Sequence, residues 1–216
     1  MADEPKIRLY GITKSRAARC MWALNELGVA YEQVPVSDRT GETREPAFLA
    51  INPNGKVPYL VDASGPTEVR IFESLAINLY LARAYGKDSL WPRDVVGEGA
   101  LYQWTLWAVN EIESPVMVAL YARDDGEQTK FDAIMGELAR SLAVLENSLA
   151  DREYLIEDRF TLVDLNVAAN CVVGAFVPYD FRDFPRILDW LGRCYARPAA
   201  HVPDSNLERF RTLIGG

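Results

Sequence analysis

The first part of the chain alternates between strand-like runs and a helical repeat of apolar residues. Residues 6–10, KIRLY, alternate apolar and polar side chains as a strand does. In residues 17–27 the apolar positions recur at helical spacing, and Gly28 supplies a stop signal. Residues 29–36, VAYEQVPV, are rich in β-branched and aromatic residues and predict a second strand. This order predicts a βαβ unit with two parallel strands.

A hairpin and a helix are predicted next, after a polar stretch and a short helix at residues 46–51, PAFLAI. The runs at 56–62, KVPYLVD, and 67–72, TEVRIF, are strand-like and are separated by ASGP. Because Gly-Pro is a turn signal, the two runs predict an antiparallel pair. Residues 73–86, ESLAINLYLARAYG, then predict a helix that ends at its glycine. Together these elements predict a mixed sheet covered by helices.

Beyond this point the pattern is helical. The polar segment at 87–97 predicts a linker. Residues 100–122 are mostly apolar, and Pro115 predicts a kink or break at Ser114, because proline lacks an N–H and its ring clashes with the preceding turn. Residues 131–149 carry apolar side chains at spacings of three and four. Such a stripe predicts packing on neighbouring helices.

Two more helices are predicted towards the C-terminal end. In residues 160–176, Thr161 and Asp164 occupy the N-cap and N3 positions of a capping box. The apolar residues of this segment lie all round the helix, which predicts burial in the middle of a bundle. Residues 183–198 predict an amphipathic helix that stops before its final proline.

These elements predict an α/β domain followed by an all-α domain. The predicted boundaries are residues 1–86 for a sheet domain of βαβαββα order, 87–97 for the linker and 98–216 for a helical bundle. A chain of 216 residues, 49% of them hydrophobic, is long enough to bury a substantial core.

Composition excludes several classes of function. The net charge of -8 disfavours binding to nucleic acid, which usually requires a basic surface. No signal peptide and no apolar run of roughly 20 residues is found, so we expect a cytoplasmic protein without a membrane span. Cys20, Cys171 and Cys194 are scattered without a CxxC motif, which predicts reduced core thiols. His201 is the only histidine, so we expect neither a histidine-based metal site nor Ser/His/Asp catalysis.

Five motifs, taken in their order and spacing, resemble the cytosolic glutathione transferases. They are LYGITKSRAARCMWALNELGVAYE, NPNGKVPYLVD, IFESLAINLYLA, FTLVDLNVAA and FPRILDWLGRCYARPA. The resemblance covers essentially the whole chain and implies a thioredoxin-like N-terminal domain, a helical C-terminal domain and a homodimer. It also implies a detoxifying enzyme that activates the thiol of glutathione, its co-substrate, for attack on small hydrophobic electrophiles or for reduction of hydroperoxides.

The resemblance implies a glutathione site built on two turns of the N-terminal domain. The peptide between Val57 and Pro58 is expected to be cis, with the N–H and C=O of Val57 pairing with the cysteinyl part of glutathione. Glu73 would pair with the γ-glutamyl ammonium, and Ser74 at a helix N-terminus would bind the neighbouring carboxylate. The structural alternatives are a trans proline that starts a strand and a serine that only caps a helix.

Charges and hydroxyls complete the implied site. Lys56 and Arg44 match positions that would bind the glycine carboxylate, although both residues also fit solvated surface charges. The thiol donor is expected in the loop after the first strand, where Ser15 matches the serine-type classes and Thr13 is the alternative. Tyr10 is a weaker candidate because it lies inside the strand. Ser15 also fits a helix N-cap without a catalytic role.

The resemblance places an electrophile pocket between the two domains, lined by the kinked helix. Its candidate residues are Trp107, Asn110 and Glu111, although aromatic residues at helical spacing also fit a core. A cysteine-type class is disfavoured, because Cys20 lies too far along the helix. Two other functions stay open: a non-catalytic binding or scaffold protein, and a specialised glutathione-dependent lyase, dehalogenase or isomerase.

Overall fold

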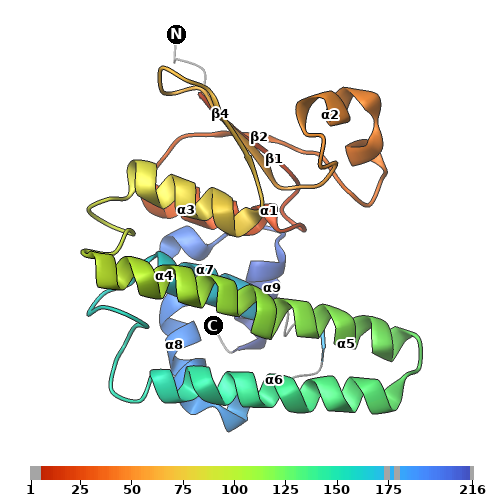
Figure 1. The fold of residues 1–216 in the computed structure, drawn as a ribbon, viewed down its shortest axis with the longest axis vertical. Helices are drawn as coiled ribbons and strands as arrows, with labels where there is room; N and C mark the ends of the chain where they lie inside the picture. The colour runs from red at the N-terminus through yellow and green to blue at the C-terminus, as the bar shows by residue number, and fades with distance from the viewer. Residues whose placement is uncertain (1–5, 173–175, 178–180, 215–216) are drawn as a thin grey trace. The chain divides into compact units, whose positions relative to one another are not determined.

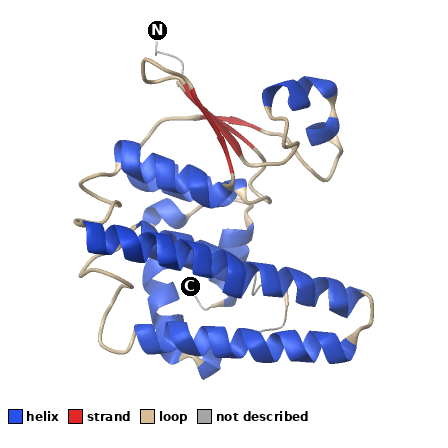
Figure 2. Cartoon of the chain, viewed as in Figure 1, coloured by secondary structure: helices blue, strands red, loops and turns tan. Residues whose placement is uncertain are grey.

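The computed structural model describes residues 6–172, 176–177 and 181–214. The chain divides into two compact units. The first unit contains Met1–Ser89 and Ala199–Glu208, and the second contains Leu90–Pro198 and Arg209–Gly216. Figure 2 shows that the strands gather in one sheet, whereas helices make up most of the rest of the chain. Among the described residues, no helix is both long and apolar enough to cross a membrane.

The first unit is built on a four-stranded mixed sheet of order β2-β1-β3-β4. The strands are β1 (Ile7–Tyr10), β2 (Glu32–Val34), β3 (Tyr59–Asp62) and β4 (Val69–Phe72). β1 pairs parallel with β2 and antiparallel with β3, and β3 pairs antiparallel with β4. The predicted parallel pair and the predicted hairpin are therefore confirmed. β2 is shorter than the predicted strand at 29–36, because Pro35 has no N–H to donate to the ladder.

Three helices cover this sheet. They are α1 (Ala17–Leu27), α2 (Pro46–Ile51) and α3 (Ser74–Tyr85), and the short 3-10 helix η1 (Glu42–Arg44) precedes α2. α1 and α3 lie side by side on one face, whereas α2 lies on the other side (Figure 1). α1 ends at Gly28, whose φ of 62° is left-handed and favours a residue without a Cβ. All three helices agree with the sequence prediction.

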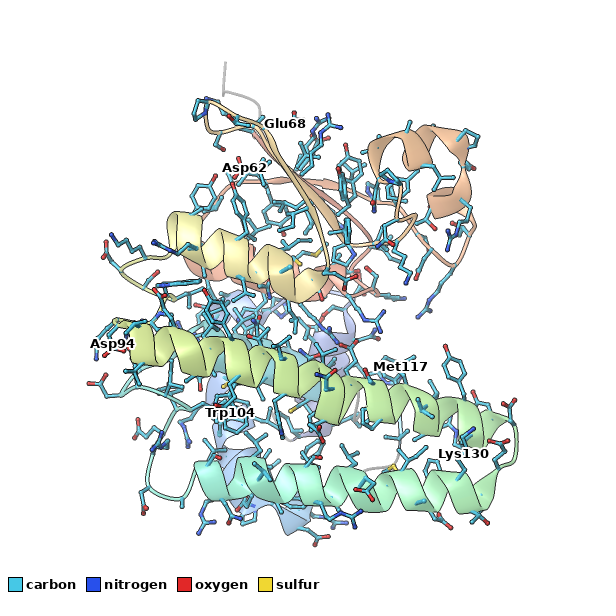
Figure 3. All side chains as sticks on the ribbon, viewed as in Figure 1. Asp62, Glu68, Asp94, Trp104, Met117 and Lys130 are labelled. Carbon is cyan, nitrogen blue, oxygen red and sulfur yellow. The ribbon has the colours of Figure 1, made fainter. Side chains whose placement is uncertain are left out.

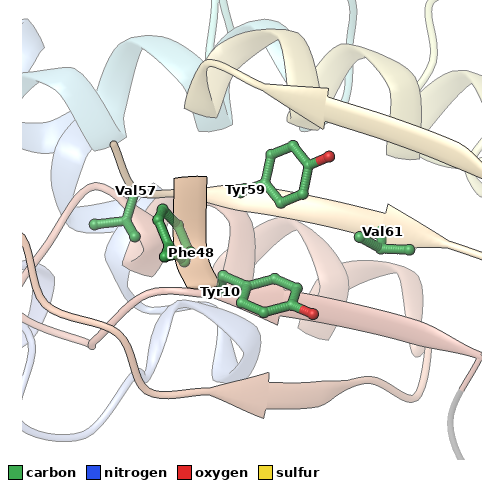
Figure 4. Packing of buried hydrophobic residues seen from close by; sticks show 5 residues of the cluster. All are labelled: Tyr10, Phe48, Val57, Tyr59 and Val61. Atoms are coloured by element: carbon green, nitrogen blue, oxygen red, sulfur yellow. The ribbon is translucent and has the colours of Figure 1, made fainter. Parts of the chain in front are cut away.

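Successive side chains of a strand point to opposite faces of the sheet, so a core forms on each face. Leu9 and Leu60 are paired across β1 and β3, and both are completely buried on the face of α1 and α3. On the opposite face, a cluster of buried side chains forms around Phe48 of α2 (Figure 4). Its other members are Tyr10, Val57, Tyr59 and Val61. The second core thus includes the residue that precedes Pro58.

The second unit is helical. Its elements are α4 (Val95–Trp107), the π-helix η2 (Ala108–Glu113), α5 (Ser114–Asp124), α6 (Gln128–Ser148), α7 (Leu162–Cys171), the 3-10 helix η4 (Phe181–Asp183) and α8 (Pro185–Tyr195). The 3-10 helix η5 (Pro198–Ala200) and α9 (Asn206–Leu213) contain residues of both units. In α6 the predicted stripe is confirmed by the burial of Leu138, Leu142, Leu145 and, just after the helix, Leu149.

Some of the helices in the second half of the chain differ from the prediction. α4 begins at Val95, inside the predicted linker, because Asp94 Oδ1 accepts the N–H of Gly97 at 2.8 Å and caps the helix. Figure 3 shows Asp94 at the start of α4. α9 was not predicted at all. In the predicted helix at 160–176, α7 ends at Cys171, and positions 173–175 lie outside the described residues.

Pro115 interrupts the long helical segment as predicted. The π-helix η2 directly precedes α5, and the N–H of Ser114 donates to the carbonyl of Val109, five residues earlier. Pro115 cannot donate to the preceding turn, and its ring occupies the space of that turn's carbonyl. A wider π turn relieves this conflict without ending the segment.

Asp164 organises the start of α7 and its surroundings. The predicted capping box is confirmed, since the side chain of Thr161 caps α7 and Asp164 Oδ2 accepts the N–H of Thr161 at 2.9 Å. Asp164 Oδ1 also accepts the N–H of Leu155 at 2.9 Å and Trp190 Nε1–H at 3.0 Å. Burial raises the pKa of this carboxyl, and the hydrogen bonds it accepts oppose the effect without cancelling it. One buried carboxyl thus joins α7, α8 and the preceding loop.

Candidate functional site

Strand register brings three loops to one end of the sheet. Tyr59, the first residue of β3, pairs with Tyr10, the last residue of β1, and with Phe72, the last residue of β4. The loop after β1, the turn before β3 and the start of α3 after β4 therefore meet at the same edge. Residues predicted from three separate motifs converge here.

The turn before β3 is held by a buried asparagine. Asn52 is completely buried, and its Nδ2 donates to the carbonyl of Lys56 at 2.8 Å. Its Oδ1 accepts the N–H of Asn54 at 3.1 Å, as in an Asx turn. Asn52 was not among the predicted site residues, although an asparagine before Pro-Asn-Gly is a recognisable turn signal.

The Val57–Pro58 peptide is cis, as predicted. The side chain of Val57 packs in the cluster of Figure 4, where the centroids of Tyr10 and Phe48 lie 6.2 Å apart. Among the described residues, none forms a hydrogen bond with the N–H or C=O of Val57. Val57 thus has an anchored side chain and unpaired main-chain groups. An extended peptide can form hydrogen bonds with these groups as a neighbouring strand would.

Glu73 and Ser74 form the start of α3. Glu73 has a φ of 71°, an uncommon conformation for a residue with a side chain, and it is exposed. Such strain clusters at ligand-binding sites. Ser74 is buried, with 5% of its surface exposed, and lies at the positive end of the helix dipole. The structure thus places a carboxylate beside a helix N-terminus at the sheet edge.

Arg19 is a charged neighbour of Ser74 that was not among the predicted site residues. It lies in the first part of α1 with only 4% of its surface exposed. Its Nη1 donates to Ser74 Oγ at 3.4 Å, and Asn78 Nδ2 donates to its backbone carbonyl at 3.4 Å. The sequence signal for a buried arginine was its place among small residues of the predicted helix. It adds a positive charge beside the serine of α3.

Arg44 and Lys56 belong to the same corner of the first unit. Arg44 ends η1 and Lys56 follows Gly55, and both side chains are exposed. A Cβ atom on Gly55 would lie 2.9 Å from Arg44 Nη1, so the guanidinium rests against this glycine. Gly55 also has a φ of 58°, which favours glycine. The structure therefore brings the two predicted cations to one turn.

The loop after β1 carries the two predicted hydroxyls. Ser15 Oγ donates to the carbonyl of Ile12 at 2.7 Å and accepts the N–H of Ala17 at 3.1 Å, so it helps to start α1. Thr13 Oγ1 donates to the carbonyl of Asp204 at 3.5 Å, a long hydrogen bond. Each hydroxyl is near the surface, and each can turn towards a ligand by rotation of its O–H.

The cysteines take no part in this site. All three are free and buried, as predicted. Burial raises the pKa of each thiol, to about 12 for Cys171 and well above the ordinary value for Cys20 and Cys194. Cys20 Sγ donates to the carbonyl of Ser74 at 3.5 Å from inside α1. Within the described parts of the chain, no group of three His, Cys, Asp or Glu side chains is arranged to hold a metal ion.

The predicted electrophile residues lie in the second unit, at the end of α4 and in η2. Trp107 packs edge-on against Trp104, with centroids 4.9 Å apart (Trp104 is labelled in Figure 3). Glu111 Oε2 accepts the hydroxyl of Ser141 at 3.1 Å, which ties η2 to α6. Asn110 is exposed. Their role towards a second substrate stays a prediction.

The fold and the site define a thioredoxin-like domain with a cis-proline turn, followed by a helical domain. Residues 5–83 match the family model of the glutathione S-transferase N-terminal domain, and residues 109–198 match that of the C-terminal domain. The chain belongs to the glutathione S-transferase family.

Individual relatives agree with this membership. Glutathione S-transferase 1 of Schizosaccharomyces pombe is 34% identical over 82% of this chain and 86% of its own length. Glutathione S-transferase 3 of Zea mays is 35% identical over 75% of both chains. A solved glutathione transferase from Burkholderia graminis, with two glutathione molecules bound per subunit, is 27% identical with a TM-score of 0.80. That comparison covers 92% of this chain and 87% of the other.

Proposed function

We propose that the protein is a glutathione transferase that uses the thiol of glutathione to attack small hydrophobic electrophiles. The observation that carries the proposal is the cis-proline turn. Its residue Val57 has a buried side chain and unpaired main-chain groups among the described residues, at an edge shared with Ser74 and the loop after β1. Family membership and the glutathione-bound relative from Burkholderia graminis support the same ligand.

Each chemical group of glutathione has a complementary residue at this edge. The N–H and C=O of Val57 pair with the cysteinyl residue in the manner of two strands. Ser74 and the N-terminus of α3 bind the γ-glutamyl carboxylate, with the positive charge of Arg19 beside them, and Glu73 pairs with the ammonium. The turn at Gly55, where the guanidinium of Arg44 rests and which Lys56 follows, receives the glycine carboxylate.

Ser15 is the first candidate for the donor to the thiol, and Thr13 is the second. The free thiol of cysteine has a pKa of about 8.5, and a donated hydrogen bond stabilises the thiolate that reacts. We assign Trp107, Asn110 and Glu111 to the electrophile pocket as predictions. The nature of the electrophile, peroxidase activity and a cytoplasmic location are likewise predictions from the sequence.

Affinity chromatography followed by turnover tests the proposed function. The protein is expected to bind immobilised glutathione, to elute with S-methylglutathione, and to turn over a chromogenic aryl halide. Cumene hydroperoxide tests the peroxidase activity in the same assay. Retention without turnover of either compound would support the scaffold function instead, and lack of retention would contradict both.

We also propose a homodimer, which an exposed apolar face of α4 supports. Val95, Tyr102 and Leu106 follow one another at spacings of seven and four on one face, with exposures of 79%, 47% and 63%. Exposed apolar residues gathered in this way are typical of protein–protein interfaces. Sedimentation is expected to give a species of about twice the 24.2 kDa mass of one chain.

A matched pair of variants identifies the interface. Leu106→Glu is expected to shift the sedimenting species to the mass of one chain, because a charge in an apolar interface is left unpaired. Val144→Glu changes another exposed apolar residue, on α6 with an exposure of 51%, and is expected to leave the dimer intact. A wild-type protein that sediments as a single chain would contradict the dimer.

A further inference from the structure

A segment near the C-terminal end holds the loop that carries the candidate thiol donors. Ala199–Glu208 belongs to the first unit although the preceding residues belong to the second. Asn206 Nδ2 donates to the carbonyl of Lys14 at 3.1 Å. The carbonyl of Asp204 accepts the hydroxyl of Thr13 at 3.5 Å. The loop is therefore contacted at two successive residues by a segment about 190 positions away in sequence.

This segment is itself held in shape by internal hydrogen bonds. Asp204 has a φ of 56°, and its N–H donates to Glu208 Oε2 at 3.1 Å. Ser205 Oγ accepts the N–H of Glu208 at 3.2 Å and donates to the carbonyl of Val202 at 2.5 Å. His201 Nδ1 lies 3.2 Å from Glu208 Oε1. The amide of Asn206 and the carbonyl of Asp204 therefore project from a defined turn.

We propose that Asn206 is a positioning residue, which holds the loop of Thr13 and Ser15 in the geometry that directs their hydroxyls to the thiol of glutathione. The proposal rests on the proposed function. Asn206 acts through Lys14, whose carbonyl lies between the two hydroxyl-bearing residues in sequence. With that carbonyl held, both neighbours keep their backbone orientation when a ligand arrives.

The hydrogen bond of the Thr13 hydroxyl fits this role. A bond of 3.5 Å from Thr13 to Asp204 is weak, so its proton is readily redirected to a thiolate, which is a stronger acceptor than a carbonyl. The amide of Asn206, in contrast, donates to the carbonyl of Lys14 at the shorter distance of 3.1 Å. The segment can thus keep the loop in place while the hydroxyl changes partner.

Two variants of Asn206 and one matched control test the proposal. Asn206→Asp keeps the size of the side chain but removes the donor, and a carboxylate at the first position of α9 suits the helix dipole. Asn206→Ala removes the side chain. Asn25→Ala removes a comparable hydrogen bond, which the side-chain amide donates from Nδ2 to the carbonyl of Ala199 at 3.3 Å. This bond holds the same segment, but it does not contact the loop of Thr13 and Ser15.

Hydrogen–deuterium exchange and thiolate formation are measured on the three variants and the wild type. In both Asn206 variants, amides of residues 12–18 are expected to exchange about fivefold faster, the effect of losing one hydrogen bond. The apparent pKa of bound glutathione, followed by thiolate absorbance, is expected to rise, and kcat to fall about fivefold with KM for glutathione within twofold. Asn25→Ala is expected to match the wild type in all three measurements.

Each outcome decides the proposal. Exchange that stays unchanged in the Asn206 variants, or that rises equally in Asn25→Ala, overturns it. Faster exchange without any change in the thiol pKa or in kcat reduces Asn206 to a structural role and overturns it as well. If the wild type neither forms the thiolate nor turns over substrate, the proposed function fails, and the exchange data alone decide whether Asn206 holds the loop.

Discussion

Replacement of Ser15 with glycine is expected to lower kcat for aryl-halide conjugation about a hundredfold, while retention on glutathione changes little. A hydrogen bond to the sulfur matters most for the thiolate, whereas binding depends on the backbone of Val57 and on the start of α3. Glycine is chosen because Ser15 also accepts the N–H of Ala17 at the start of α1. Ser15 directly precedes Arg16, the N-cap residue of α1, and glycine is better tolerated than alanine where a helix begins. Steady-state kinetics with both substrates varied provide the measurement.

Two further variants separate catalysis by Ser15 from catalysis by Thr13. Ser15→Thr keeps a hydroxyl and is expected to retain most of the activity. Thr13→Ala leaves the hydrogen bond from the N–H of Ala17 to Ser15 Oγ intact, and it is expected to have the smaller effect. If Thr13→Ala shows the hundredfold loss and Ser15→Gly does not, the role belongs to Thr13. Equal activity in all variants and the wild type would exclude both hydroxyls.

Replacement of Asp164 with alanine is expected to lower the free energy of unfolding by at least about 3 kcal/mol. The change removes the capping box of α7, which alone contributes about 1 kcal/mol. It also leaves the N–H of Leu155 and the indole N–H of Trp190 without their acceptor in a buried position. Urea unfolding followed by tryptophan fluorescence measures the loss.

Asp158→Asn is the control for this variant. Asp158 also accepts a hydrogen bond, from Arg93 Nη1 at 2.8 Å, but its side chain is 79% exposed. Exposed ion pairs contribute little, so the control is expected to unfold at the urea concentration of the wild type. A similar midpoint for both variants would contradict the role of Asp164.

The sequence predicted those elements whose signals are local. The capping box of Thr161 and Asp164 and the effect of Pro115 depend on residues within one or two turns, and both were confirmed. α9 was missed because its segment has no strong apolar repeat that would predict a helix. Its start depends instead on hydrogen bonds of Ser205 and Glu208. The early start of α4 was missed because Gly97 and Gly99 weaken the helical pattern, whereas a single aspartate cap decides the boundary.

The site was predictable where a motif carries it and not where tertiary packing does. The cis peptide before Pro58 followed from the resemblance and is present. Arg19 and Asn52 act through contacts with residues of other elements or with a turn carbonyl, and neither contact has a periodic signature. Asn206 meets Lys14 from the far end of the chain, so local patterns contain no information about that pairing.

The depth at which the cysteines lie has a chemical consequence for a protein proposed to handle glutathione. Exchange with glutathione disulfide requires an accessible thiolate on the protein. Cys20, Cys171 and Cys194 offer neither access nor ionisation near neutral pH. Burial therefore disfavours mixed disulfides between these three cysteines and the oxidised form of glutathione.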